Sequence, residues 1–474
     1  MNVSGDSSAS LRLSIYLVLI ALSAGAMLGR ILAVSSVDVI AVEGQLFREG
    51  REDWRRQRPF LSANDRSRWA TVRALVEHGT YAIDDVIDER GWDTIDMVKH
   101  PGRDGQDHLY SSKPPLLATL MAGQYWIIHR LTGATLGEHP YEIGRFMLVS
   151  INLTAMLVYF TVLVKLVERL GTSDWSRIYV MGAATFGTFL TTFVVSINNH
   201  LPAAVCAAIA LWAAVRIWYD GERGYGYFAL AGFFAAFAAA NELPALSLFA
   251  LVAAALLWKC PRQTLVAYAP PALLVAAAAI STNYIAHGSL RPPYMHRSQT
   301  DPADNWYDYS YERGGKTRDS YWRNPQGVDS GEASPVRYAL HATIGHHGIF
   351  SLTPIWILSV WGVAILVLQP ERRALALFIA TLSLVCLAFY LLRPEIDRNY
   401  GGMTSGFRWV FWFAPLWLVA LMPAVDRLAC CRAGRSFALV LLAASAMSAT
   451  YPTWNPWTHP WLANLTNYLG WTNF

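Results

Sequence analysis

Long apolar runs recur along the whole chain, and no other feature of the sequence restricts its fold so strongly. A membrane-spanning helix needs about 20 mostly apolar residues. A soluble protein carries about 25% charged residues, whereas only 15% of these 474 residues are charged. The sequence therefore predicts an all-α, multi-pass membrane protein with about eleven spans, at 11–34, 145–167, 177–197, 201–218, 225–240, 243–258, 264–286, 346–368, 374–392, 408–425 and 436–451.

The distribution of Lys and Arg predicts which side of the membrane each loop faces. One further apolar segment, Pro114 to Leu131, is short and begins with two prolines. If it does not cross, the short loops on one side carry twelve Lys and Arg and those on the other side five. Because cytoplasmic loops collect these residues, we expect this segment to lie along the membrane interface. The N-terminus is then cytoplasmic, and the two long polar loops face outwards from the cell (inner or plasma) membrane.

One part of the first polar loop has the pattern of a helix. Asn64 and Asp65 precede Trp69, Val72 and Leu75, which fall on one helical face. Asx residues suit a helix N-cap, and the apolar stripe suits a helix that lies on a membrane. We therefore expect Asp65 at the water–lipid boundary, at the positive end of a helix.

Three short motifs occur in order around this helix. They are Asn64-Asp65-Arg66-Ser67-Arg68-Trp69-Ala70, Ser112-Lys113-Pro114-Pro115-Leu116 and Gly144-Arg145-Phe146. Together they resemble the GT-C membrane glycosyltransferases, and within these they are most similar to the group of protein O-mannosyltransferases and lipid A aminoarabinose transferases. The resemblance in the order of elements covers about 11–258, and beyond that only hydropathy and general layout agree.

The resemblance implies a GT-C fold, with interfacial helices in the first outer loop, and a particular reaction. Such enzymes transfer a sugar from a polyprenyl-phosphate donor to a lipid, glycan or protein hydroxyl on the extracytoplasmic face. It assigns the catalytic base to Asp65 and places Lys113 and Arg145 near the donor phosphate. The family often has a second acidic residue after the Asp, whereas this chain has Arg66. A divalent metal is therefore left open, and no other cofactor is predicted.

The residue types fit this chemistry. A carboxylate can take the proton of an attacking hydroxyl, and cations stabilise the charge that develops on a leaving phosphate. Arg binds phosphate through paired hydrogen bonds, whereas Lys acts as a point charge. Arg408, which opens a span, is a further phosphate candidate. A single base opposite the leaving group predicts inversion at the sugar carbon. The alternatives are helix capping by Asp65 and anchoring at the membrane by Lys113, Arg145 and Arg408.

Polar residues near the outer span ends are weaker candidates, because polar groups at membrane depth usually face a cavity. We interpret Asn241 and Glu242, which interrupt a long apolar stretch, as a tight outer hairpin between two short spans. The candidates for lining a pocket are Arg66, Asn199, His200, His346 and His347.

The predicted organisation places the expected chemistry in the outer loops. Long ordered loops usually bind or catalyse. The parts are a first span (1–34), an outer catalytic loop (35–131), spans two to seven (132–286), a second outer loop (287–345), spans eight to eleven (346–451) and a Trp-rich outer tail (452–474).

Two other functions stay open, a transporter or flippase of lipid carriers and a non-catalytic membrane subunit. Transporters tend to place polar residues at mid-membrane and to contain repeats, and we find neither here. Because Arg66 stands where the family often has a second acidic residue, a non-catalytic subunit remains an alternative. Membrane lipids are expected partners. The formal net charge of +4, without a basic run, argues against nucleic acid.

Overall fold

The computed structural model describes residues 3–37 and 58–472. Residues 38–57 of the predicted outer catalytic loop, and 473–474 of the tail, lie outside the described residues. The described part is mostly helical, which agrees with the sequence. Its helices are α1 (Val3–Leu32), α3 (Ala63–Arg73), α4 (Asp84–Asp88), α5 (Pro115–Thr132), α6 (Pro140–Leu148), α7 (Thr154–Leu170), α8 (Asp174–Phe186), α9 (His200–Tyr219), α10 (Tyr225–Asn241), α11 (Leu246–Lys259), α12 (Pro261–Gln263), α13 (Ala269–His287), α14 (Pro335–Thr343), α15 (Ile349–Leu352), α16 (Trp356–Val367), α17 (Arg373–Leu391), α18 (Ala414–Leu428), α19 (Arg432–Thr450) and α20 (Trp461–Tyr468).

The helices that could cross a membrane are fewer than expected. In the described residues, seven helical segments are long and apolar enough, and three shorter apolar helices accompany them. The count of eleven is therefore not confirmed. The predicted span at 177–197 stays helical only to Phe186, where Gly187 follows and the chain continues in turns and a short 3-10 helix, Phe193–Val195. Glycine and the threonines after it are poor helix formers, which accounts for this early end.

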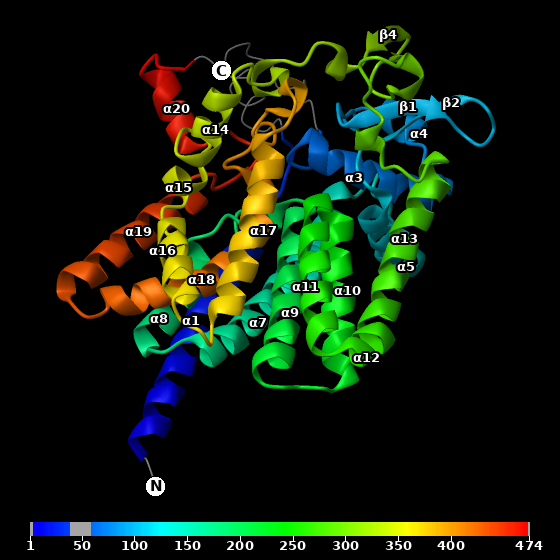
Figure 1. The fold of residues 1–474 in the computed structure, drawn as a ribbon. Coiled ribbons are helices and arrows are strands. Elements are labelled where there is room, and N and C mark those ends of the chain that lie inside the picture. The colour runs from blue at the N-terminus through cyan, green and yellow to red at the C-terminus, as the bar shows by residue number, and fades with distance from the viewer. Residues whose placement is uncertain (1–2, 38–57, 473–474) are drawn as a thin grey trace.

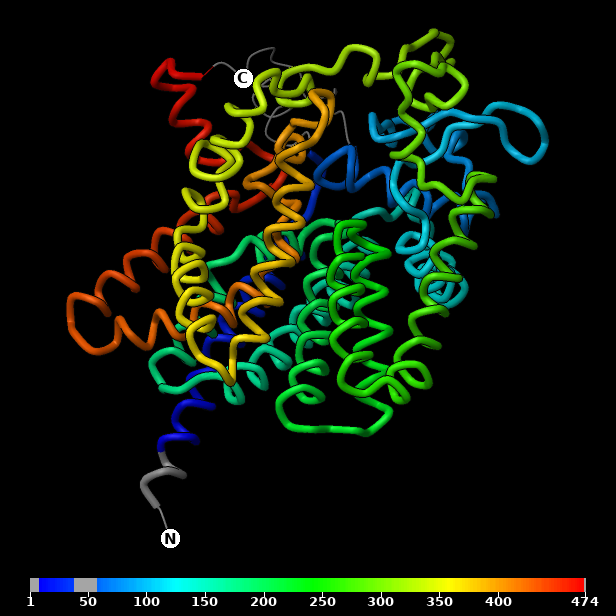
Figure 2. Tube along the Cα trace, viewed as in Figure 1, coloured from blue at the N-terminus to red at the C-terminus, as the bar shows by residue number. Residues whose placement is uncertain are grey.

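Both polar loops lie at the same end of the molecule. In Figure 1, α3, α4 and the β1–β2 hairpin gather at the top with β4, α14 and α20, and α1 begins at the bottom. Figure 2 traces the connection between α9 and α10 at the bottom end, so the next connection, between α10 and α11, returns to the end with the loops. Helices α9, α10 and α11 pack side by side between these ends.

Two small antiparallel hairpins are an addition to the all-α prediction. Strand β1 (Met97–Pro101) pairs with β2 (Asp107–Ser111), and β3 (Ser310–Arg313) pairs with β4 (Lys316–Asp319). Gly314 and Gly315 both have positive φ in the second turn, the conformation that two-residue hairpin turns require. The backbone N–H of Lys99 in β1 donates to the carbonyl of Trp306, at 3.0 Å. The two loops therefore form one layer.

Helix α3 differs from the amphipathic surface helix that the sequence predicts. Its N-cap is Ser62, whose side chain accepts a hydrogen bond from the backbone N–H of Asp65, so neither Asn64 nor Asp65 is the cap. Every residue from Asn64 to Arg73 is buried within the protein, and the helix packs against α5. The expectation of an apolar stripe lying on the membrane surface is therefore wrong for α3. The helix forms the interior of the loop layer.

Candidate functional site

A cavity of about 760 Å³ lies between the loop layer and the spans. It is lined from α3, from the segment before α5, from the start of α9, from the turn between α10 and α11, and from the 3-10 helix Arg408–Phe413 that leads into α18. Ionisable side chains of both signs line it. They are Arg68, Lys113, His200, Arg297, Arg393 and Arg408, with Glu242, Asp304, Glu395 and Asp397.

The local backbone holds Arg408 in this cavity. Its Nε donates to the carbonyl of Gly401 at 2.6 Å, and its Nη1 donates to Nε2 of His200 at 2.9 Å. Gly401 has φ +93, a conformation that favours glycine, and a Cβ there would lie 3.1 Å from Cγ of Arg408. The glycine-rich segment before the predicted span therefore positions the Arg408 side chain through the Gly401 carbonyl and leaves room for it.

A second guanidinium, that of Arg68, reaches the cavity from α3. It donates to both the carbonyl and the side-chain oxygen of Asn64, one helical turn earlier, and its Nη2 donates to Oδ1 of Asn199 at 2.6 Å. Burial, together with repulsion from Arg408, lowers the pKa of Arg68 to about 10. In the sequence, Arg68 stands out only as part of a motif. Its spacing of four residues from Asn64 was the signal that both side chains share one helical face.

Neither Arg68 nor Arg408 forms an ion pair with a carboxylate in the described parts of the chain. The other cations of the cavity have such partners: Lys113 pairs with Asp96 at 2.7 Å, and Arg297 and Arg393 both reach Asp397, at 3.3 and 2.8 Å. Buried charges are normally paired. The buried guanidinium of Arg68 and the half-buried guanidinium of Arg408 repel each other and face one cavity. They therefore form a site suited to an anion.

Lys113 also lines the cavity, and its ammonium forms an ion pair with Asp96. Burial works to raise the pKa of Asp96, but the Lys113 ammonium outweighs it and holds that pKa below its ordinary value. Burial also lowers the pKa of Lys113 itself, against the attraction of Asp96. The Lys113 ammonium lies at the edge of the cavity, and the carboxylate of Asp96 balances its charge.

Glu242 belongs to the site, although its place in the sequence predicted only a hairpin. The hairpin between α10 and α11 is present, but Glu242 is only 5% exposed and lines the cavity. Its Oε1 accepts a hydrogen bond from Nδ2 of Asn199 at 2.8 Å and also contacts Nδ1 of His200. A carboxylate inside an apolar stretch of a membrane protein is by default a functional candidate, and that signal was present in the sequence.

Asp65 lies beside the cavity and is not one of its lining residues. Its side chain is fully buried; Oδ1 accepts hydrogen bonds from Nε1 of Trp69 and from the backbone N–H of Ile197, each at 2.9 Å. Oδ2 has no hydrogen-bond partner in the described residues. Burial raises the pKa of Asp65 to about 7, although these hydrogen bonds and Arg68 act against it. The carboxyl group is thus held in a state that ionises near neutral pH.

Arg145 and Arg66 do not line the cavity. Nε and Nη2 of Arg145 both donate to the carbonyl of Val34, just after α1, at 2.9 and 2.6 Å. The neighbouring Gly144 lies against the ring of Phe60, where a Cβ would be 2.5 Å from Cε1. Arg66 donates to the carbonyls of Asp93 and Pro59. These arginines tie loop segments together.

His346 and His347 form a separate cluster with other rings. His346 stacks on His341 at 3.9 Å between ring centroids, and His347 stacks on Tyr400 at 4.8 Å. His459 of the tail lies beside His347. Throughout 3–37 and 58–472, no group of three or more His, Cys, Asp or Glu is arranged to hold a metal ion. Of the predicted residues, the structure gathers Lys113, Asn199, His200 and Arg408 in one cavity.

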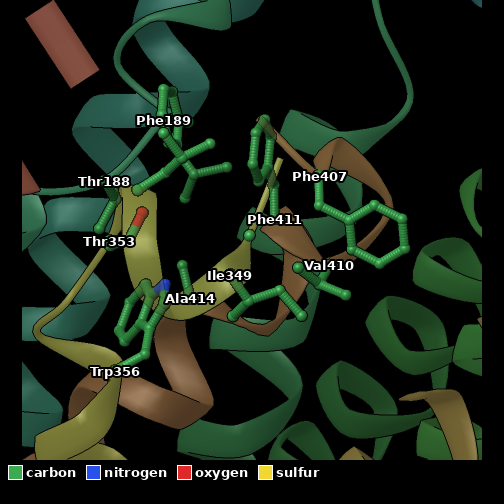
Figure 3. Close-up of a pocket in the computed structure, with 12 residues that line it drawn as sticks. Thr188, Phe189, Ile349, Thr353, Trp356, Phe407, Val410, Phe411 and Ala414 are labelled. Atoms are coloured by element: carbon green, nitrogen blue, oxygen red, sulfur yellow. The ribbon is translucent and has the colours of Figure 1, made fainter. Parts of the chain in front are cut away.

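A small apolar cavity of about 20 Å³ lies behind the Arg408 segment. Figure 3 shows Phe189, Phe407 and Phe411 around it, with Thr188 and Thr353 at one side. The rings of Phe189 and Phe411 stack, at 5.2 Å between centroids. No ionisable side chain lines this cavity. Its walls are therefore part of the packing around the 3-10 helix that carries Arg408, and they contain no candidate catalytic group.

Comparisons with known proteins give limited similarity. No family model matches the chain, and no curated protein matches it. Two matching solved structures are of the oligosaccharyltransferase of Archaeoglobus fulgidus. A complex with Zn and sulfate is 15% identical, with a TM-score of 0.40, over 84% of this chain and 49% of that one. AglB in complex with an inhibitory peptide and a dolichol-phosphate is 14% identical, with a TM-score of 0.43, over 94% of this chain and 56% of that one. The chain thus spans about half the length of each protein, and at these low TM-scores it is only distantly similar to them.

Proposed function

We propose that this chain is a GT-C-type membrane glycosyltransferase. It moves a sugar from a polyprenyl-phosphate donor to a lipid, glycan or protein hydroxyl on the extracytoplasmic face of the cell membrane. The three sequence motifs suggest the class, and the cavity supplies the chemical support. The observation that carries the proposal is a pair of guanidiniums, that of the buried Arg68 and that of the half-buried Arg408, which face one cavity and form no ion pair with a carboxylate in the described residues.

The proposed donor site is the part of the cavity between these two guanidiniums. A phosphate diester carries one negative charge, and the leaving polyprenyl phosphate gains a second as the bond from its oxygen to the sugar carbon breaks. Guanidiniums that already point at that position stabilise the added charge without reorganising. Lys113 is close enough to repel Arg68 and Arg408, and it lies at the edge of this site in an ion pair with Asp96. In this proposal Arg145 has no phosphate contact, because it is committed to Val34.

Asp65 is the proposed base. The acceptor oxygen forms the new bond to the sugar carbon, and its proton passes to the carboxylate, with inversion at that carbon. Two features support Asp65: a pKa raised to about 7, close to the working range of a general base, and an Oδ2 atom without a hydrogen bond in the described residues. To reach an acceptor in the cavity, the side chain has to leave the hydrogen bonds to Trp69 and Ile197 or share them.

The proposal is tested by release of polyprenyl phosphate. Purified protein in lipid nanodiscs is given a panel of polyprenyl-phosphate sugars with a crude envelope extract as acceptor. We expect release that requires both protein and acceptor and that falls at least tenfold in Arg408→Gln. Arg337→Gln is the matched control, because Arg337 is exposed and pairs with Glu332 away from the cavity. No release from any donor by folded protein would refute the transferase and favour a carrier transporter or a non-catalytic subunit.

A further inference from the structure

One buried carboxylate is connected to both guanidiniums of the proposed phosphate site. Glu242 accepts a hydrogen bond from Asn199, whose Oδ1 in turn accepts from Arg68. Glu242 also contacts Nδ1 of His200, whose Nε2 accepts from Arg408. Asn199 and His200 are neighbours at the start of α9. Each of them forms a bridge between the Glu242 side chain and one guanidinium, Asn199 to Arg68 and His200 to Arg408.

The hydrogen-bond roles in this network are fixed by chemistry. Arg is always a donor, so Nε2 of His200 must accept from Arg408, and its proton must be on Nδ1, facing Glu242. In the same way, Asn199 must present its oxygen to Arg68, which turns its amide nitrogen to Glu242. Nδ2 of Asn199 also donates to the backbone carbonyl of Asn241, at 2.9 Å, so Oε1 of Glu242 is the acceptor that Asn199 and His200 share.

We infer that Glu242 is a positioning residue that holds Arg68 and Arg408 in the geometry needed to bind the phosphate of a polyprenyl-phosphate substrate. The inference rests on the proposed function. Positioning and simple electrostatics predict opposite effects of Glu242 on the affinity for an anion. A carboxylate near an anion site weakens anion binding through repulsion, whereas an acceptor that aligns two guanidiniums strengthens it.

Two neutral variants separate these effects. Glu242→Gln and Glu242→Met both remove the negative charge, but only Gln keeps an oxygen that can accept from Asn199 and His200. The experiment measures the Kd of a polyprenyl phosphate for the full-length protein in nanodiscs. We expect Glu242→Gln to bind at least as tightly as the wild type and Glu242→Met to bind roughly tenfold more weakly, which corresponds to about 1.4 kcal/mol.

A third variant covers the case in which Glu242→Met does not fold. Asn199→Ala removes one bridge without changing any charge, and we expect it to weaken binding in the wild type but to have little further effect in an Arg68→Gln background. The inference would be overturned if Glu242→Gln and Glu242→Met bound with equal affinity. It would also be overturned if Asn199→Ala bound as tightly as the wild type. Neither outcome would contradict the proposed function. Absence of binding by the wild type would refute both.

Discussion

Replacing Asp65 by Asn should change stability in a pH-dependent manner. Burial raises the pKa of this carboxyl from 3.8 to about 7, so the folded protein prefers the protonated form. The Asn side chain resembles that form: its oxygen can still accept from Trp69 and Ile197, while its nitrogen takes the place of the Oδ2 atom that lacks a partner. The variant thus removes the ionisation and keeps the geometry.

The sign and size follow from the linkage between protonation and folding. Below pH 3.8 both the folded and the unfolded states hold the proton, and no cost arises. As the pH rises, the unfolded chain ionises first, and the folded state loses stability until the pH passes about 7. A shift of about three pKa units corresponds to roughly 4 kcal/mol. About 2 kcal/mol of this cost is present at pH 5 and almost all of it at pH 8.

The assay is thermal unfolding of wild type and Asp65→Asn in nanodiscs at pH 5 and pH 8. We expect the variant to gain stability relative to the wild type by roughly 3 kcal/mol more at pH 8 than at pH 5. The buried nitrogen of Asn adds a cost that does not vary with pH, so only the difference between the two pH values is informative. Asp104→Asn is the control, because hydrogen bonding by His108 lowers the pKa of Asp104 and no gain at pH 8 is expected. An equal effect of Asp65→Asn at both pH values would refute the reasoning.

Three further predictions concern the cavity. Arg408→Lys keeps the charge but replaces the two separate nitrogens that bond Gly401 and His200 by a single one, so we expect roughly tenfold weaker binding of a polyprenyl phosphate; unchanged binding would contradict this. Gly401→Ala should weaken binding more than Gly402→Ala, measured in the same assay, since both have positive φ but only Gly401 contacts Arg408. Lys113→Met leaves Asp96 buried without its cation and should destabilise the fold by about 3 kcal/mol at pH 7. Thermal unfolding should show recovery in the double variant with Asp96→Asn, and no recovery would count against the pair.

The hydropathy pattern predicted most of the helices, because burial in lipid or protein demands continuous apolar runs whatever the tertiary contacts. It failed at 177–197, where composition was apolar enough but Gly187 and its threonines ended the helix at Phe186. It also failed for α3, whose apolar stripe looked amphipathic although the polar residues between are buried as well. Tertiary hydrogen bonds, such as that from Ser67 to the carbonyl of Asp96, are what make such burial tolerable. A one-dimensional pattern does not contain them.

The cavity was only partly predictable for a similar reason. Lys113, Asn199, His200 and Arg408 stand out in sequence as polar groups beside apolar runs. Glu242 has the same signal, but a hairpin explained its presence equally well. What decides between the two is its contact with Asn199 and His200, which are more than forty residues away in the chain. Contacts over such separations follow from helix packing and are not encoded in local spacing.

The position of Asp65 links the fold to the proposed chemistry in a way that a simple loss of activity would not resolve. Its Oδ1 anchors the backbone N–H of Ile197, two residues before Asn199, and thereby fixes the segment that presents Asn199 and His200 to the cavity. Asp65 is therefore placed to act both as a base and as an anchor for the phosphate site. Asp65→Asn removes only the base, because the amide oxygen still anchors Ile197, whereas Asp65→Ala removes both functions. A base role thus requires that Asp65→Asn abolish transfer while phosphate binding persists, and an anchoring role requires that binding fall only in Asp65→Ala.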